Sequence, residues 1–177
     1  MRQRALLFTL SVCPALLLAQ PRRELNIRIP EAPQGVRLDT IGRTTKIGAP
    51  EARTFDAVVK AYEEFGIARN TESRANGEVG NTALVVRRQF ANDRLSRAMD
   101  CGRGITGDYA DQYRMTLALV TWVRPFGAAG DSATVHTAIV GGGRATDGTT
   151  AWPMQCASLG RFEAKLADRV KQLVREP

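Results

Sequence analysis

The chain has 177 residues, of which 44% are hydrophobic and 24% charged, and its formal net charge is +7. This length suits one domain with a real core and excludes a large multidomain protein. The positive excess is modest, scattered and made almost wholly of arginine, so we expect no nucleic-acid partner, whose site would gather its charge on one face.

Residues 1–19 have the order of a secretory signal peptide. Two arginines precede an apolar run that extends from Ala5 to Ala19, and polar residues follow it. The run is shorter than the ~20 residues that a membrane span needs, and no later segment is uninterruptedly apolar. We therefore predict an extracytoplasmic protein, periplasmic or secreted, with no transmembrane span in the mature chain. Loss of the two signal arginines lowers the formal charge to +5.

Lipidation of Cys13 is the alternative. Leu10–Ser11–Val12–Cys13 approaches the bacterial lipobox, and an acyl chain on Cys13 would tether the domain to the outer membrane. Val12 departs from that box, and residues 15–19 are apolar where a lipoprotein has a polar tether. Cleavage near Ala19 is therefore favoured, with lipidation left open.

The mature chain is expected to begin with a leader. Residues 20–35 contain three prolines and paired arginines with little apolar periodicity, which predicts an extended segment outside the core. Residues 36–177 then form a single predicted domain. It opens with an irregular strand near Val36, Leu38 and Thr40, where apolar and polar residues alternate.

Residues 51–65 give the clearest helix signal. Apolar side chains recur at the i, i+3, i+4, i+7 spacing of one helix face, at Phe55, Val58, Val59, Tyr62 and Phe65. A second amphipathic helix is predicted over residues 159–173, with Ser158 as its cap.

Two hairpins are predicted between the helices. The first joins residues 67–71 to residues 82–90 through Asn76–Gly77, a dipeptide favoured in tight turns. The second joins residues 113–124 to residues 133–139, whose side chains alternate. Three segments between and after these strands have weaker patterns: residues 95–101 fit a strand or a helical turn, and residues 102–107 and 141–150 are predicted loops.

These elements predict an α+β domain. A single antiparallel β-sheet has an apolar face to cover, and the two amphipathic helices packed on one face would cover it.

Cys101 and Cys156 remain after removal of the signal peptide. An even pair of cysteines in an oxidising compartment predicts a disulfide. It would close a loop of about 56 residues, for which chain entropy gives about 4 kcal/mol of stabilisation. A metal site is not indicated, since His136 is the one histidine and no third cysteine remains.

Two further patterns suggest ligands. Gly141–Gly143 with Arg144 resembles part of a phosphate loop, but no helix with the required Lys and Ser or Thr follows. Asp100, Asp108 and Asp111 surround a glycine-rich loop without the spacing of a calcium site, which favours turn-forming roles. We expect no cofactor and no metal.

His136 is the one residue that suggests catalysis. A single histidine suffices for a hydrolase triad, so an extracytoplasmic hydrolase using His136 is an alternative function. It lies in the middle of a predicted strand, however, and the sequence holds no Gly-x-Ser-x-Gly elbow. An ordinary strand histidine is favoured, and we expect no catalytic residues.

One face of the long hairpin is a candidate binding face. Trp122 shares a strand face with Arg114 and Arg124, and Arg87 is expected on the same side of the neighbouring hairpin. Aromatic and arginine side chains on a sheet suit an anion, a polysaccharide or a protein partner. The alternative is that Trp122 fills a second core layer.

Residues 55–90 show a helix, then Phe65–Gly66–Ile67, a short strand, the turn at Asn76–Gly77 and a longer strand. This order resembles the helix-grip domains of BamC-like lipoproteins of the outer-membrane assembly machinery, and also uncharacterised exported proteins of high-GC bacteria. The resemblance implies a place in the cell envelope. Export, together with the absence of a convergent catalytic set, predicts a non-catalytic accessory or binding domain, whose partner we expect to be another envelope protein or a surface polymer.

Overall fold

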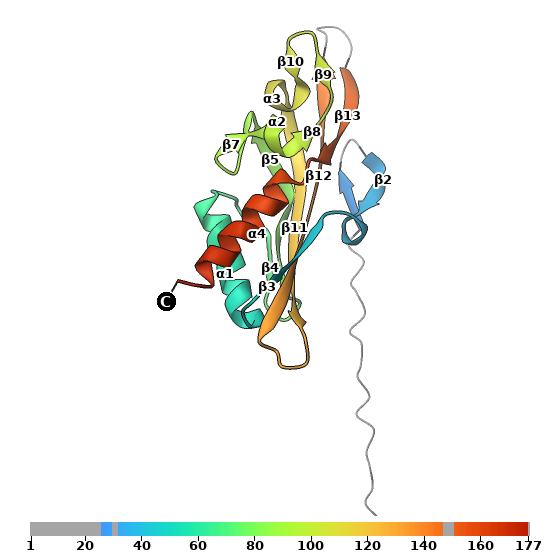
Figure 1. The fold of residues 1–177 in the computed structure, drawn as a ribbon. Coiled ribbons are helices and arrows are strands. Elements are labelled where there is room, and N and C mark those ends of the chain that lie inside the picture. The colour runs from blue at the N-terminus through green and yellow to red at the C-terminus, as the bar shows by residue number, and fades with distance from the viewer. Residues whose placement is uncertain (1–25, 30–31, 147–150, 177) are drawn as a thin grey trace, which may run out of the picture.

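The computed structural model describes residues 26–29, 32–146 and 151–176 (Figure 1). The predicted signal peptide, Cys13 and parts of the predicted leader lie outside these residues. Within them the chain is an α+β domain built on a large antiparallel sheet, as the alternating segments predicted.

The centre of the sheet is a long hairpin. β11 (Arg114–Phe126) and β12 (Ser132–Thr146) pair continuously from Met115 opposite Gly143 to Phe126 opposite Ser132. β5 (Glu78–Arg87) pairs with the other edge of β11. Two strands share the outer edge of β12: β3 (Arg43–Ile47) pairs with one end and β13 (Ala151–Ser158) with the other.

Four short strands complete the large sheet. β4 (Thr71–Ser73) and β6 (Gln89–Phe90) pair with β5, β7 (Asp93–Arg94) pairs with β6, and β8 (Met99–Asp100) pairs with β13. The predicted hairpin at Asn76–Gly77 is therefore present, with its strands placed slightly differently.

The prediction of a single sheet is wrong. β1 (Asn26–Ile29) pairs with β2 (Ala32–Arg37) in a separate two-stranded sheet. β9 (Arg103–Gly104) pairs with β10 (Gly107–Asp108) in another, inside the predicted loop 102–107. Gly107 makes that second hairpin possible because its φ of 124° is rarely adopted by other residues.

Two long helices cover one face of the large sheet, as predicted (Figure 1). α1 (Glu51–Glu64) is followed by Phe65 and then Gly66, whose φ of 66° lets the Ile67 N–H donate to the Tyr62 carbonyl. α4 (Arg161–Leu173) follows Gly160. Two single-turn helices, α2 (Leu95–Ala98) and α3 (Tyr109–Gln112), lie near one end of the sheet. Residues 95–101, predicted as a strand or a helical turn, contain both α2 and the short strand β8.

Ser158 is not the cap of α4 that the sequence suggested. The helix begins after Gly160, and Ser158 Oγ instead accepts a hydrogen bond from the Gly160 N–H and donates one to Glu163. Ser158 thus fixes the turn between β13 and α4.

The main core lies between the helices and the sheet. Its fully buried members include Phe55, Tyr62, Met115, Leu117, Leu119, Ile139 and Leu166. The Tyr62 hydroxyl lies 2.9 Å from the Thr121 hydroxyl, which in turn lies 3.0 Å from that of Thr137, so these three buried hydroxyls satisfy one another.

A smaller second core covers the middle of the opposite sheet face. It contains Leu38 of the 3₁₀ turn η1 (Leu38–Thr40), with Val36 and Ile41, packed on Ala118, Val120, Trp122, Ala138 and Val140. The segment lies on the side of the sheet away from α1 and α4 (Figure 1). The sheet extends at both ends beyond the N-terminal segment around Leu38 that covers this face (Figure 1).

The prediction of a loop beginning at Gly141 is wrong, because β12 continues to Thr146. A Cβ at Gly141 would lie 2.5 Å from Leu117 Cδ2, and one at Gly143 would lie 2.4 Å from Met115 Sδ. The glycines therefore serve close packing against large neighbouring side chains, and the strand runs through them.

Candidate functional site

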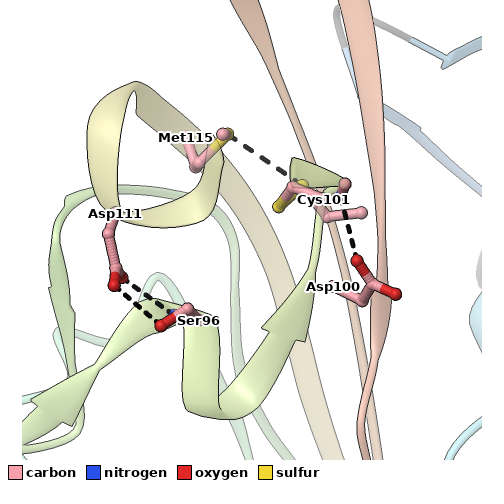
Figure 2. The surroundings of a disulfide bond; sticks show 7 residues. Ser96, Asp100, Cys101, Asp111 and Met115 are labelled. Atoms are coloured by element: carbon pink, nitrogen blue, oxygen red, sulfur yellow. Dashed lines mark hydrogen bonds between the residues drawn. A yellow bond between two sulfur atoms is a disulfide. The ribbon is translucent and has the colours of Figure 1, made fainter. Parts of the chain in front are cut away.

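Cys101 and Cys156 form the predicted disulfide, with their Cα atoms 4.2 Å apart. Cys101 follows β8 and Cys156 lies in β13, so the bond closes the corner where these two strands pair. Both cysteines are buried, and Cys156 Sγ lies 4.0 Å from Met115 Sδ (Figure 2). The disulfide is thus part of the core at one end of the sheet.

Two aspartates hold the chain around this corner (Figure 2). Asp111 accepts hydrogen bonds from the backbone N–H and the hydroxyl of Ser96, at 3.0 and 2.7 Å. Asp100 accepts one from the Gly102 N–H at 2.9 Å. The Asp100 contact is the turn-forming role expected from the sequence, whereas Asp111 joins two segments that lie fifteen residues apart.

Trp122 belongs to the second core. Only 7% of its surface is exposed, and its ring lies 5.5 Å from that of His136. His136 Nδ1 in turn lies 2.8 Å from the Thr44 hydroxyl on β3. Trp122 therefore contributes packing under the N-terminal segment and offers little surface to a ligand.

Arg124 is separated from the other candidate arginines. It lies ten residues along β11 from Arg114, which corresponds to roughly 33 Å of strand. Its guanidinium donates to the backbone carbonyls of Asn76 and Val123. The predicted face Arg87, Arg114, Trp122 and Arg124 is thus not one patch.

The structure instead gathers Arg87, Arg114 and Arg144 into one row across three neighbouring strands, which we call the arginine row. Arg87 is the register partner of Arg114. Met115 pairs with Gly143, so Arg144 is the next residue of β12 beside Arg114. Since Met115 points into the main core, alternation directs the arginine row to the opposite face.

The arginine row is exposed and lacks acidic partners. No carboxylate in residues 26–29, 32–146 and 151–176 pairs with its guanidiniums, whereas Arg69, Arg74 and Arg169 each pair with an acid. Neighbouring strands lie about 4.8 Å apart, so the row spans about 10 Å between its outer strands.

Like charges opposite one another on adjacent strands destabilise a sheet. The arginine row therefore disfavours the fold locally. It adjoins Val85, of which 48% is exposed, and Thr116, the register partner of Val85. The arrangement can hold several acidic groups at once, because each guanidinium can bind a carboxylate or phosphate with two hydrogen bonds.

Sequence reasoning missed Arg144 as a member of this row. Its signal was present: from Thr134, every second residue through Arg144 lies on the same side of β12. The glycines at 141–143 were interpreted as a break in that pattern, and so Arg144 was assigned to a loop.

Fold and site together define a disulfide-bonded α+β domain with a row of exposed arginines, unpaired among the described residues, on the sheet face opposite its helices. The comparisons add no family to this class: no protein-family model and no curated protein matches the chain. None of the helices that the structure describes is long and apolar enough to span a bilayer.

Proposed function

We propose that this protein is an exported, non-catalytic binding domain of the bacterial cell envelope, and that the arginine row binds an acidic surface polysaccharide. The single observation that carries the proposal is the alignment of three exposed arginines without acidic partners on adjacent strands. The signal-like residues 1–19 and the disulfide support an extracytoplasmic location. The BamC-like order of residues 55–90 supports a place in the envelope.

A linear polyuronate fits the row better than other polyanions. Its carboxylates repeat regularly along a chain, and the row offers a regular series of guanidiniums across the sheet. Arginine recognises a carboxylate through two parallel hydrogen bonds. Val85 adds an apolar surface against which the C–H groups of a sugar ring can pack.

Single-stranded nucleic acid fits less well. Proteins that bind it without sequence preference stack its bases on aromatic side chains. The residues of β5, β11 and β12 that adjoin the row on its face are Val85, Thr116 and Gly142. A surface of this kind can hold acidic groups but offers no stacking platform.

The test is binding of the purified protein to polygalacturonate by isothermal titration calorimetry at several salt concentrations. Because the contacts are charge-assisted and exposed, affinity should fall steeply as salt rises from 50 to 500 mM. Arg114→Gln should weaken binding about tenfold, since one charge-assisted hydrogen bond contributes about 1.5 kcal/mol or more.

The matched control is Arg175→Gln, which removes the same charge from an exposed residue just beyond α4. It should leave the affinity within about twofold of the unaltered protein, because surface charges outside the site contribute little. Salt-independent binding, or equal losses in the two variants, would contradict the proposal.

A further inference from the structure

A polar cavity lies beside the β9–β10 hairpin, toward the end of the sheet that carries α2 and α3 (Figure 1). Its volume is about 620 Å³, within the range of small-molecule pockets. Its walls come from Arg88, β6, β7, the β9–β10 hairpin and α3. Apart from Gly107, every residue that lines it is charged or polar, so the cavity suits a polar occupant.

Both acids of the cavity wall already have partners. Asp108 lies 3.8 Å from the guanidinium of Arg103, which lines the same wall. Asp111 accepts one hydrogen bond on each carboxylate oxygen, from the backbone N–H and the hydroxyl of Ser96 (Figure 2). The two carboxylates therefore leave the other cations of the cavity uncompensated.

Those cations are Arg88 and Arg94, whose side chains are both exposed. Across the described residues no carboxylate lies within ion-pair distance of either guanidinium. Their backbones are adjacent, because Gln89 is the register partner of Arg94 and the Leu95 N–H donates to the Arg88 carbonyl at 2.8 Å. Two unpaired cations that line one cavity favour an anionic occupant.

The surroundings impose the backbone conformation at Arg88. Arg88, Ala91 and Asn92 have φ angles of 63°, 51° and 63°, and they are the non-glycine residues with positive φ in the described part of the chain. Such conformations persist only where other contacts hold them. In this strained turn Arg88 Nε donates to the Asp111 carbonyl at 3.3 Å, and Asn92 Nδ2 donates to the Glu64 carbonyl at 3.2 Å. The first contact uses Nε alone, so the two terminal nitrogens of Arg88 can bind an oxyanion.

A phosphate group matches the two unpaired charges. At neutral pH a phosphate monoester carries about −1.5 to −2 charges, whereas a carboxylate carries one. Each guanidinium can bind phosphate oxygens through two parallel hydrogen bonds. The cavity is larger than a phosphate ion, which leaves room for a polar group joined to the phosphate.

We propose that this cavity binds a small, polar phosphate monoester, such as a phosphorylated polyol. Arg88 and Arg94 hold the phosphate, and the exposed Gln89 amide and Thr106 hydroxyl bind the hydroxyl groups of the remainder. The cavity shares no residue with the arginine row, and neither proposal requires the other.

The test is an NMR titration of the purified, disulfide-bonded protein with glycerol phosphate, inorganic phosphate and acetate. Both phosphates should bind at least about tenfold more tightly than acetate, because their second charge engages the second guanidinium. Glycerol phosphate should bind more tightly than inorganic phosphate. The reverse order would overturn the monoester and assign the cavity to the free ion.

Two variants of the cavity should change the affinity for glycerol phosphate in opposite directions. Arg94→Gln should weaken binding about tenfold, since it removes a charge-assisted contact. Asp108→Asn should tighten binding roughly twofold, because a negative charge leaves the cavity wall. The matched control, Arg175→Gln, should leave the affinity unchanged.

The three substituted side chains are exposed, so unchanged melting temperatures will show that the variants fold. Binding of glycerol phosphate no tighter than that of acetate would overturn the proposal. Equal affinity of the Arg94 variant and the unaltered protein would also overturn it, as would weaker binding by the Asp108 variant.

Discussion

Replacement of Gly143 by alanine tests the strand that carries Arg144. The new Cβ would lie 2.4 Å from Met115 Sδ and 2.8 Å from the Arg114 carbonyl oxygen. The sulfur belongs to a flexible side chain and can move, but the carbonyl belongs to β11, so the two central strands must separate locally.

The expected cost follows from two opposing effects. Overpacking of this kind lowers the free energy of unfolding by about 1–3 kcal/mol. Replacing a strand glycine by alanine raises it by about 0.5–1 kcal/mol, because alanine loses less backbone entropy on folding. Because the backbone must shift, we expect a net loss of about 2 kcal/mol. For a domain of this size that corresponds to a fall in melting temperature of about 4–8 °C.

Urea and thermal unfolding followed by circular dichroism would measure this loss. The matched control is Gly48→Ala, because a Cβ there meets no atom within 4 Å. The control should change stability by no more than about 0.5 kcal/mol. A Gly143→Ala variant as stable as the control would refute the reasoning, and residues 141–146 would then be the loop that the sequence suggested.

Three other perturbations test other parts of the fold. Replacing Cys101 and Cys156 by serine should lower the free energy of unfolding by about 4 kcal/mol in urea titrations, and a loss under 1 kcal/mol would contradict the loop-closure estimate. Burial raises the pKa of Tyr62 above its usual value of about 10, so the unfolded chain ionises first and stability should fall above about pH 10. Tyr62→Phe should remove that part of the alkaline loss, measured by urea unfolding at pH 8 and 11; an identical pH dependence in both proteins would refute this. Asn92→Ala should cost about 1–2 kcal/mol, since it loses the bond to Glu64 and leaves alanine at positive φ, and an unchanged midpoint would argue against the strained turn.

The sequence predicted the elements that have strong periodic patterns. The apolar stripe of residues 51–65 corresponds to α1, and the alternation around Leu117 and Leu119 corresponds to β11. The disulfide followed from the two cysteines that remain after the predicted signal peptide and from the oxidising compartment that this signal implies. In each case a local or compositional property determines the structure directly.

The remaining features depend on tertiary contacts. The strand character of Gly141–Gly143 comes from the side chains of Leu117 and Met115, which occupy the space that Cβ atoms would fill. Pro125, the first residue beyond the strand predicted over residues 113–124, pairs with Ala133 as part of β11. The alternation from Thr134 to Arg144 permits a strand through these glycines, but the contacts with β11 establish it.

The candidate site likewise combines residues that the sequence pattern places correctly with residues that only tertiary contacts place. Alternation placed Arg87 and Arg114 on one face, and their direct pairing confirms that placement. The register of β12 brings Arg144 beside them, which required the strand to continue through the glycines. Trp122 shares the sheet face, but the N-terminal segment around Leu38 covers it, and no local pattern indicates that cover.

The most direct test of polyuronate binding is an NMR titration that follows the arginine Nε–Hε resonances. On addition of polygalacturonate, the resonances of Arg87, Arg114 and Arg144 should shift together, with one shared affinity that weakens as salt is added. Those of Arg124 and Arg175 should stay in place. Shifts confined to arginines outside the row, or no shift in the row at saturating polymer, would contradict the account.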